Sequence, residues 1–494
     1  MRVFVGKGEV YLHDVATRKK AKQVLWGDWL DVIESDGDWH KVRWGKVSYW
    51  IPKKDCIEEA PLDVIILDVG QGDGSIVTTP GRPDERRVIV VDAGKGDNVY
   101  RFIKWRYGKY AKDVRFHAAV ATHSDLDHYL GFQRLLDEPK QHFERFYHNG
   151  IAEREGDDLL GPSDPSGRYL TSIMVTHADI QALYSDPVVR GRKTYPRLMH
   201  TALTSGKVDR VEMLASEVSH GMANRHWMPG FSPAENPDFT IEILGPLIEA
   251  GDDGSPRLRW FGKKIGSTDR DEGKTKNGHS VILRVAYQGF TLVLGGDLNK
   301  PAEDFLLRAY SGIGDGQPLR DAVAHAQSRW RSDLLKCCHH GAADVTDEFL
   351  EAVNPSAFAV SSGDDESYVH PRPELLGRLG RFGRGDQPLI LCTEILRSTR
   401  EREATSLFKT INQQNALIEK PGTNDTVIKA AKAKRAAALE EMARRNVQVY
   451  GAINIRTDGK DLAIAFLKER AVADRWHIYW YRQDEQKGFI PIEK

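Results

Sequence analysis

The segment Ala121-Thr122-His123-Ser124-Asp125-Leu126-Asp127-His128 decides the fold, because two imidazoles and two carboxylates follow directly on an apolar run at 116–120. Such a run predicts a buried β-strand. A loop at the end of a strand can fold so that alternate side chains converge on a pair of metal ions, with the His-x-Asp pair on one ion and the Asp-His pair on the other. A polar turn that happens to hold these residues is the alternative.

Three later segments carry the same signature of metal-type side chains after an apolar strand. Leu294-Gly295-Gly296-Asp297 ends in a carboxylate, and LKCCHHG at 335–341 ends in paired histidines and a glycine that permits close approach. After AFAVSS at 357–362, the segment Tyr368-Val369-His370-Pro371 brings another histidine. Four strand ends of this kind are hard to explain as packing, so the sequence favours a metal site over a polar turn.

Long apolar strands alternate with helical segments over residues 62–136, which predicts an α/β layered domain. Residues 138–275 are rich in Gly, Pro, Asp and Arg, and we interpret them as an insertion of helices and loops that returns to the sheet at FTIEILGP, 239–246. Further strands are expected at 279–297 and 333–340. Over 401–494 the sequence predicts an Ala-rich helix and a hairpin closed by Asp458-Gly459, as an extension packed on the α/β domain.

Residues 1–60 contain short alternating runs separated by Gly-Asp and Asp-Gly turns, a pattern that predicts a small antiparallel β-barrel. The order of Trp26-Gly27-Asp28, Gly37-Asp38-Trp39 and Ser48-Tyr49-Trp50-Ile51 is similar to that of bacterial SH3-like domains. A groove lined by Trp26, Trp39 and Trp50 would bind a peptide or a protein partner. The alternative is that these aromatic side chains fill the core of the barrel.

Composition excludes several classes of protein. The chain has 494 residues with 70 Lys and Arg against 71 Asp and Glu, and this balance excludes a uniformly basic nucleic-acid binder but not a locally basic one. No run approaches the roughly 18 apolar residues of a membrane span, and the N-terminus resembles no signal peptide. The four cysteines lack the spacing of a zinc or redox motif. We therefore expect a cytoplasmic protein that has no membrane segment.

The motifs, in this order, resemble the metallo-β-lactamase-fold domain of the ComEC competence proteins. The resemblance covers residues 62–400 and rests on Asp68-Val69-Gly70-Gln71-Gly72-Asp73, Val91-Asp92-Ala93-Gly94, His123-x-Asp125-x-Asp127-His128, Asn277-x-x-Ser280, Gly296-Asp297, His339-His340-Gly341 and Tyr368-x-His370-Pro371. It implies a fold of the α/β class, a four-layer αββα sandwich with a two-metal site between the sheets. The commonest motif of the superfamily has His where Asp125 stands, and the membrane channel of the full competence proteins is not part of the resemblance.

The resemblance also implies a ligand set. One divalent ion would be held by His123 and Asp125, the other by Asp127, His128 and His340, and Asp297 would bridge the two ions. His340 is preferred to His339 because the histidine just before the glycine is the usual ligand in the superfamily. Asp92 would steer the metal-binding loop from behind. Many relatives add a ligand from the middle of the domain, and this choice stays open among His177, His200, His220 and His226, each of which is otherwise a surface or structural histidine.

The chemistry of such a site is hydrolysis of a phosphodiester. Two cations about 3.5–4 Å apart lower the pKa of a bridging water and stabilise the attacking and leaving oxygens. The Asp125 carboxylate favours Mn²⁺ or Mg²⁺ over Zn²⁺ at the first position, so we expect two divalent ions, Mn²⁺ or Zn²⁺, with Mg²⁺ as a further option. Catalytic roles are expected for Asp127, for Lys336 and His339 on a phosphate oxygen, and for His370 as proton donor to the leaving group. The alternative for the last three is that they support the fold.

A nucleic-acid surface is a hypothesis for residues 100–110, YRFIKWRYGKY, where cations alternate with aromatic side chains. The alternative is a helix packed on the sheet with its charged face in water. The basic residues Lys429, Lys432, Lys434 and Arg435 are a weaker candidate, because Glu440 and Glu441 follow closely.

We therefore expect a two-metal hydrolase, a phosphodiesterase or nuclease that acts on DNA through a metal-bridging hydroxide. One alternative is a hydrolase of a small ester such as a cyclic nucleotide, phosphocholine or a lactone, since one fold supports several chemistries. The other alternative is an interaction protein that binds a partner through its SH3-like barrel. The complete ligand set argues against this last alternative.

Overall fold

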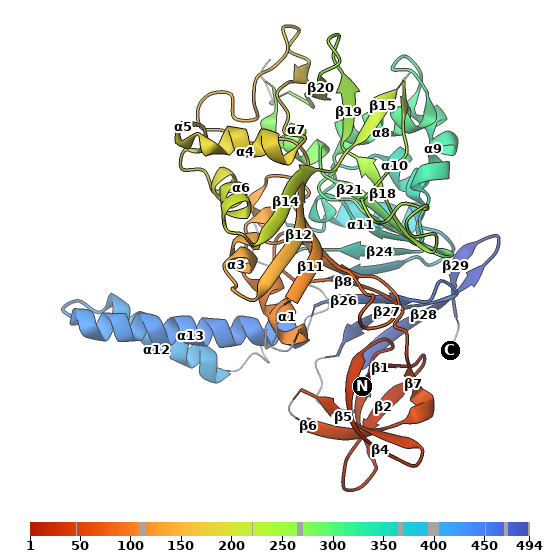
Figure 1. The fold of residues 1–494 in the computed structure, drawn as a ribbon, viewed down its shortest axis with the longest axis vertical. Helices are drawn as coiled ribbons and strands as arrows, with labels where there is room; N and C mark the ends of the chain where they lie inside the picture. Colours follow the sequence, from red (N-terminus) through yellow and green to blue (C-terminus); the bar gives the residue numbers. More distant parts are fainter. Residues whose placement is uncertain are drawn as a thin grey trace.

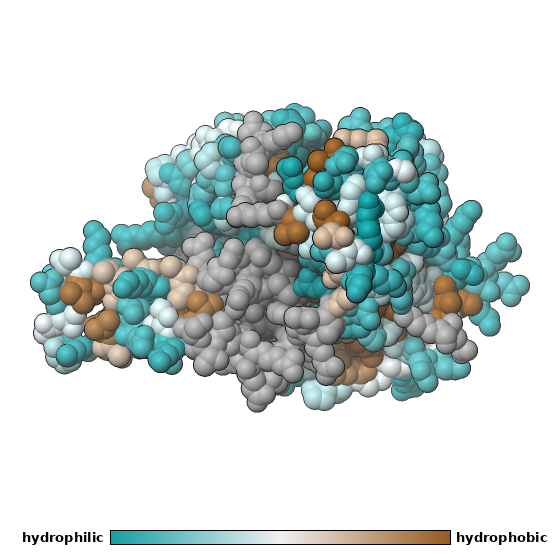
Figure 2. Space-filling model, turned by 90° about the horizontal axis from the view of Figure 1, so that it is seen from below, coloured by the Kyte–Doolittle hydropathy of each residue, from teal (hydrophilic) through white to brown (hydrophobic). Residues whose placement is uncertain are grey.

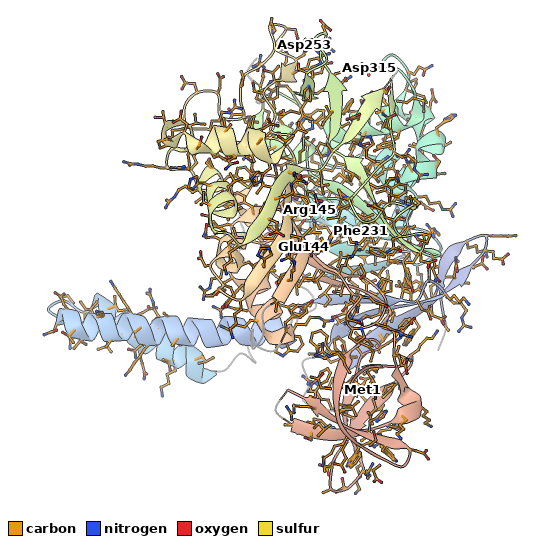
Figure 3. The ribbon with its side chains drawn as sticks, in the orientation of Figure 1. Met1, Glu144, Arg145, Phe231, Asp253 and Asp315 are labelled. Atoms are coloured by element: carbon orange, nitrogen blue, oxygen red, sulfur yellow. The ribbon has the colours of Figure 1, made fainter. Side chains whose placement is uncertain are left out.

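Two large β-sheets face each other in the computed structural model, and helices cover the outer face of each sheet (Figure 1). The structure describes residues 1–45, 47–107, 114–219, 221–263, 270–363, 369–393, 405–449, 451–468 and 473–492. An apolar core between the sheets takes side chains from both, together with Phe231, which is labelled in Figure 3. One further apolar core joins the first sheet to its helices, and another joins the second sheet to its helices. The predicted mixed α/β organisation is confirmed.

The first sheet has ten strands in the order β14–β12–β11–β10–β9–β8–β26–β27–β28–β29. Strands β10, β11, β12 and β14 are parallel to their neighbours in this series, so the loops that follow β10, β11 and β12 leave the sheet at one edge. The bounds are β8 (Leu62–Ile66), β9 (Gly74–Thr78), β10 (Val88–Ala93), β11 (Val114–Val120), β12 (Gln141–His148), β14 (Val208–Met213), β26 (Ile453–Thr457), β27 (Asp461–Leu467), β28 (Trp476–Asp484) and β29 (Gly488–Pro491).

The second sheet has seven strands in the order β17–β18–β21–β22–β23–β24–β25. Strands β22 to β25 are parallel, and their residues are largely buried because the first sheet covers one face and helices cover the other. The bounds are β17 (His226–Trp227), β18 (Phe239–Gly245), β21 (Ile282–Tyr287), β22 (Phe290–Leu294), β23 (Leu334–Lys336), β24 (Ala357–Val360) and β25 (Leu389–Cys392).

The helices pack on the sheets through one apolar face each. Between residues 98 and 204 they are α1 (Asn98–Arg106), α2 (Leu126–Tyr129), α3 (Phe132–Leu136), α4 (His177–Ser185), α5 (Pro187–Arg190) and α6 (Thr194–Thr204). Between residues 272 and 382 they are α7 (Glu272–Gly278), α8 (Lys300–Ser311), η2 (Leu319–Ala322), α9 (Val323–Trp330), η3 (His339–Gly341), α10 (Asp347–Val353) and α11 (Pro373–Phe382).

The expectation that 138–275 is an insertion of helices and loops does not hold, because this segment supplies strands to both large sheets. Strands β12 and β14 extend the first sheet and β17 lies at the edge of the second, while the return to the sheet expected at 239–246 is found as β18. Charged residues hid β12 from the apolar pattern: Glu144 and Arg145 lie on it (Figure 3), and Arg145 Nη1 donates to Glu212 Oε2 of β14 at 2.8 Å. A small five-stranded sheet also lies in this segment, formed by β13 (Tyr169–Leu170), β20 (Pro256–Arg259), β19 (Leu247–Ala250), β15 (Ser216–Ser219) and β16 (Met222–Ala223).

The N-terminal strands form an antiparallel sheet in the order β3–β2–β6–β5–β4–β1–β7, and the expected closed barrel is not found in the described residues because β3 and β7 do not pair. The reason lies at β3, where Gln23 N donates to Ala473 O at 2.9 Å and Trp476 N donates to Gln23 Oε1 at 2.8 Å. The C-terminal segment thus binds at the free edge of β3. The bounds are β1 (Arg2–Val5), β2 (Val10–His13), β3 (Lys20–Val24), β4 (Trp29–Asp36), β5 (Trp39–Trp44), β6 (Val47–Pro52), η1 (Lys53–Asp55) and β7 (Cys56–Ile57).

Packing separates Trp26 from Trp39 and Trp50, the other two tryptophans proposed to line a peptide groove. Trp26 is buried against the C-terminal strands, where its ring stacks on Trp480 with 5.9 Å between ring centroids. The Arg18 guanidinium lies 3.7 Å from the ring centroid of Trp50 and 4.9 Å from that of Trp39. Trp26 therefore joins the N-terminal sheet to the rest of the molecule and is not available to a peptide.

The C-terminal region extends the first sheet, since β26 pairs with β8 in the register Ile453↔Ile66 (Figure 1). Before it, α12 (Thr405–Glu419) and α13 (Asp425–Val449) pack together as an arm that projects from the body of the molecule. Apolar residues lie among polar ones on the surface of this arm (Figure 2). Leu417 of α12 and Val427 of α13 are exposed apolar side chains. Lys429, Lys432 and Lys434 are exposed on α13.

A buried cluster of charged side chains joins the N-terminal sheet, the first large sheet and α1. Asp63 of β8 forms ion pairs with Arg106 of α1 and with Arg456 of β26. Arg456 Nη2 also lies 3.6 Å from Asp28 Oδ1 in the N-terminal region. Because all four groups are nearly excluded from water, their mutual pairing is a condition of their burial.

Candidate metal centre

The side chains singled out in the sequence approach one another where strand ends of the two large sheets meet. His123 and Asp125 follow β11 of the first sheet, and Asp127 and His128 lie on α2 directly after them. Asp297 follows β22 of the second sheet, and His339 and His340 follow β23 in η3. The positive φ angles of His339 and His340, 48° and 53°, mark a strained turn from which the His340 ring reaches Asp127 and His128.

Ligand atoms of four residues approach one another in this cluster. His340 Nε2 is 3.2 Å from Asp297 Oδ2, 3.4 Å from Asp127 Oδ2 and 3.2 Å from His128 Nε2. His128 Nε2 is in turn 3.3 Å from Asp297 Oδ1. Donors that bind one ion through bonds of about 2.0–2.2 Å are themselves about 3.0–3.5 Å apart. This group therefore has the donor types and the spacing of a metal site.

The two imidazoles are held from behind by carboxylates. His128 Nδ1 lies 2.9 Å from Asp92 Oδ2, and Asp92 is fixed in turn by two hydrogen bonds of 2.8 Å that it accepts from Thr122 N and Thr122 Oγ1. His340 Nδ1 lies 3.2 Å from the backbone oxygen of Ser361, its hydrogen-bond partner, and 3.3 Å from Asp73 Oδ1. A carboxylate on Nδ1 fixes the ring and leaves Nε2 to bind a metal.

Asp73 is the residue that sequence reasoning missed. It stood in the motif 68–73 without a role, yet it lies with His128, Asp297 and His340 in a group whose ligand atoms are all within 4.8 Å of one another. Its loop reaches α2 because Gly72 has no side chain, since a Cβ at Gly72 would stand 2.2 Å from Asp127 O. Its second oxygen forms an ion pair with Lys336, and we therefore assign Asp73 to orienting His340.

A second group of donors shares Asp297. His123 Nε2 is 3.7 Å from Asp125 Oδ2 and 3.9 Å from Asp297 Oδ2. This Nε2 atom is fully buried and makes no hydrogen bond among the described residues, while Nδ1 of the same ring lies 3.3 Å from Ser280 Oγ. A buried nitrogen that faces two carboxylates and has no hydrogen bond fits a cation between them.

Lys276 already places one positive charge at this second group. Its Nζ forms an ion pair with Asp125 and lies 3.2 Å from Glu153 Oε1, which also accepts a hydrogen bond from Ser124 Oγ at 3.1 Å. With its amide nitrogen turned toward the acceptor, Asn277 donates to Asp125 Oδ2 at 3.0 Å. Sequence reasoning gave neither Lys276 nor Glu153 a role, and only the position of Lys276 beside the motif residue Asn277 hinted at one.

The pKa values report how strongly the cluster favours positive charge. Burial alone would lower the pKa of His128, but Asp297 and Asp92 raise it well above its usual value, and Asp297 and Asp73 do the same for His340. Burial would raise the pKa of Asp127, yet the hydrogen bond to His340 and the charge of His128 lower it to about 2. Protons hold the carboxylates together in the absence of metal, and a divalent ion would replace them.

The three residues expected to contact substrate differ in access. Lys336 is buried, paired with Asp73, and directed at Gly296 O at 3.4 Å, so it neutralises Asp73 and does not reach a phosphate in this structure. The His339 side chain is 31% exposed at the rim, with Nε2 3.9 Å from Asp297 Oδ2. The ring centroid of His370 lies 6.0 Å from that of His339, and burial together with the charges of His339 and His340 lowers the pKa of His370 to about 4.

None of the described middle histidines belongs to the group of metal-type side chains found in the described residues. His177 accepts a hydrogen bond from Val211 N at 3.0 Å, His226 pairs in β17, and His200 faces a surface cavity on α6. His220 lies outside the described residues, as does Tyr368 of the last motif. His148, which sequence reasoning passed over, ends β12, and burial lowers its pKa to about 3, so it is neutral.

The segment proposed as a nucleic-acid surface serves the fold in its described part. Tyr100 and Phe102 lie on the buried face of α1. Arg101 pairs with Asp97 at 2.6 Å, and Arg106 pairs with Asp63. The structure thus has the packed helix that was the alternative, with Trp105 as its exposed aromatic side chain. Residues 108–110 of the segment lie outside the described residues.

Two competence proteins are similar to this chain. ComE operon protein 3 of Bacillus subtilis (strain 168) is 27% identical over 335 residues, which are 65% of this chain and 30% of that protein. Competence protein ComA of Neisseria gonorrhoeae is 29% identical over 130 residues, which are 26% of this chain and 16% of that protein. The chain thus spans less than a third of the length of either relative. No family model matches the chain.

These matches support a relationship to competence proteins, and together with the buried Asp and His cluster they fit a metal-dependent hydrolase or nuclease. They also correct the expected location. The prediction of a cytoplasmic protein is contradicted, because both relatives are competence proteins by name, and these names point against a cytoplasmic location. Among the described helices, none combines the length and the apolar composition that crossing a bilayer requires.

Proposed function

We propose that this chain is a metal-dependent phosphodiesterase that cleaves DNA, built on a metallo-β-lactamase-type sandwich with two divalent ions at the strand ends. One observation carries the proposal: Nε2 of His340 lies 3.2 Å from both Asp297 Oδ2 and His128 Nε2 and 3.4 Å from Asp127 Oδ2, and His128 Nε2 lies 3.3 Å from Asp297 Oδ1. Asp297 also faces His123 of the neighbouring group, which suits a carboxylate shared by two ions. Similarity to two competence proteins supports DNA as the substrate.

When bound, divalent ions supply an activated water at neutral pH and stabilise charge on phosphoryl oxygens. Imidazole and carboxylate ligands of this kind suit Mn²⁺ or Zn²⁺. The residues of the chain hold the geometry. Asp92 holds the ring of His128 through Nδ1, and Ser361 O, with Asp73 Oδ1 beside it, holds the ring of His340 through Nδ1, so that the two Nε2 atoms lie 3.2 Å apart. The buried ion pair with Lys336 keeps the Asp73 carboxylate ionised.

Substrate would approach from the rim, where the side chains of Asp125 and Asp127 are 31% and 23% exposed. His339 is the exposed imidazole beside them, and it is placed to donate a hydrogen bond to a phosphoryl oxygen. His370 behind it is neutral at pH 7 because its pKa is about 4, so it would accept or donate one hydrogen bond and not carry charge. In this proposal His339 contacts the substrate and His370 positions His339.

The test compares cleavage of fluorescent single- and double-stranded DNA in Mn²⁺ by the wild-type chain and two variants. Asp127→Ala removes a ligand, and Asp252→Ala makes the same change at an exposed loop residue as the matched control. We expect cleavage by the wild type and Asp252→Ala and a loss of at least about a hundredfold in Asp127→Ala. Cleavage unchanged in Asp127→Ala would contradict the proposal. Hydrolysis of a cyclic nucleotide or phosphocholine ester without any DNA cutting would replace it.

The SH3-like assignment of the N-terminal strands and the partner expected for them remain predictions. Of the three tryptophans, Trp39 alone is partly exposed, and Trp26 contacts the C-terminal strands. A role for these strands in holding the C-terminal segment is better supported by the hydrogen bonds of Gln23 to residues 473 and 476.

A further inference from the structure

A polar cavity of about 460 Å³ lies beside the metal centre on the helical layer of the first sheet. Helices α3, α5 and α6 form its walls, and we call it the α6 cavity. Its described lining contains Arg190, Arg197 and His200, the hydroxyl residues Thr194 and Thr201, one glutamine and two leucines, and none of these residues carries a carboxylate. A polar cavity with two permanent positive charges and no lining acid favours an anion.

The cations of the α6 cavity are held near one another. Arg190 Nη1 donates to Tyr184 O at 2.7 Å, which fixes the guanidinium at the end of α5. Burial and the charge of Arg190 lower the pKa of His200, so these two groups are electrostatic neighbours and His200 is neutral at pH 7. Arg197 lies on the first turn of α6 with an exposed side chain. The guanidinium groups can bind phosphate oxygens in pairs, and the Thr194 hydroxyl can donate a further hydrogen bond, whereas the Thr201 hydroxyl already donates to Arg197 O at 3.0 Å.

The α6 cavity is attached directly to the metal-binding segment. Leu130, which lines it, follows His128 by two residues, so the two Cα atoms are at most about 7.6 Å apart. Tyr129, between them, donates from its hydroxyl group to Thr194 Oγ1 at 2.9 Å, and its ring contacts Tyr195 with 5.0 Å between centroids. The short helix that carries Asp127 and His128 is therefore joined to the cavity through Leu130, the residue that follows it, and through the hydrogen bond from Tyr129 to Thr194.

We propose that the α6 cavity binds a backbone phosphate of the same nucleic-acid strand whose neighbouring phosphodiester lies at the metal centre. The inference rests on the proposed function, because a strand is the ligand that presents one phosphate to the metal ions and another to a cationic pocket a short way along. Such a site would hold the strand in register with the metal centre and would give affinity without reading base sequence.

The test measures binding without cleavage. A 12-nucleotide, 5′-fluorescein-labelled single strand is titrated with the full chain in EDTA, and anisotropy gives the Kd over a range of salt concentrations. Arg197→Ala is the principal variant because the exposed Arg197 side chain is the least able to affect folding, and Arg190→Ala/Arg197→Ala follows. Lys53→Ala/Lys54→Ala removes the same charge from the exposed turn η1 and is the matched control.

We expect Arg197→Ala to weaken binding about tenfold, and the double variant to weaken it further and to lower the slope of log K against log salt by about two. The control should bind like the wild type. Wild-type affinity in the double variant, or an equal loss in the control, would overturn the inference. Competition by inorganic phosphate as strong as that by the oligonucleotide, phosphate for phosphate, would also overturn it, since the cavity would then take the free ion.

The two proposals fail separately. If binding depends on Arg190 and Arg197 but Mn²⁺ supports no cleavage of any DNA, the phosphate site stands and the nuclease proposal falls. If Asp127-dependent cleavage is observed while the arginine variants bind and cleave as the wild type does, the nuclease proposal stands and the phosphate site falls.

Discussion

The buried ion pair of Asp73 and Lys336 permits a prediction that separates folding from metal binding. The side chains of Asp73 and Lys336 are 5% and 3% exposed. Asp73 Oδ2 pairs with Lys336, and Asp73 Oδ1 lies 3.3 Å from His340 Nδ1. Asp73→Asn keeps the shape of the side chain but leaves the Lys336 ammonium group buried beside a neutral amide. Loss of one partner of a buried pair costs about 3–5 kcal/mol. We expect the lower end, about 3 kcal/mol, because Asp297 also stabilises the charge of Lys336.

The same substitution acts on the metal site through His340. A carboxylate on Nδ1 makes Nε2 a stronger ligand, and removal of such a partner lowers metal affinity about tenfold to a hundredfold. The double variant Asp73→Asn/Lys336→Met removes both charges at once and leaves no uncompensated ion. Its stability should therefore return to within about 1 kcal/mol of the wild type, while its metal affinity should stay low.

Urea unfolding in EDTA measures the first effect, and calorimetric titration with Mn²⁺ or Zn²⁺ measures the second. Lys336→Met alone completes the cycle: it strands the Asp73 carboxylate, so added metal should stabilise this variant more than it stabilises the wild type. The reasoning is refuted if Asp73→Asn unfolds at the wild-type urea concentration. It is also refuted if the double variant regains metal affinity together with stability, because Asp73 would then be a counter-ion only.

Three further substitutions test other parts of the structure. Burial raises the pKa of Glu303 from 4.5 to about 8, so its contribution to stability is present below pH 4.5 and is lost as the pH rises through 8. The free energy of unfolding of the wild type should therefore fall between pH 5 and pH 9 by up to about 5 kcal/mol more than that of Glu303→Gln. Parallel profiles of the free energy of unfolding against pH for the wild type and this variant would contradict that. Lys276→Met removes a cation that competes with a metal ion for Asp125, so the affinity for Mn²⁺ should rise about tenfold in the calorimetric titration. Weaker Mn²⁺ binding by this variant would mean that Lys276 supports the site. Asp63→Asn strands Arg106 and Arg456 and should lower the free energy of unfolding by about 3–5 kcal/mol, and a loss below about 1 kcal/mol in urea would argue that water reaches the cluster.

Much of the site could be read from strand ends. An apolar run followed by His, Asp or Gly is visible in the sequence, and parallel neighbours in one sheet bring such ends to one edge. His123, His128, Asp297 and His340 were selected in this way, and the structure places their ligand atoms within a few ångströms of one another. Their roles as metal ligands remain predictions that the titrations above would test.

What the sequence did not reveal depends on partners that are distant along the chain. Nothing local says that Asp73 meets Lys336, 263 residues away, or that Lys276 meets Glu153. Strand β12 escaped notice because Glu144 and Arg145 interrupt its apolar alternation. Partners on neighbouring strands, such as Glu212, offset the free energy of partly burying these charges. The open N-terminal sheet likewise follows from residues near 473 that bind the edge of β3.

The position of β26 beside β8 has a consequence for the order in which the molecule is made. The strand leading to the Asp73 loop leaves the ribosome early, yet its neighbour in the sheet is nearly four hundred residues later, at Ile453↔Ile66. Until then an apolar strand with an unpaired edge must be shielded, which is the situation in which nascent chains aggregate or recruit chaperones. The sheet that carries the Asp73 loop would therefore be completed only once residues 453–457 have been made, so a chain truncated near residue 450 should be insoluble.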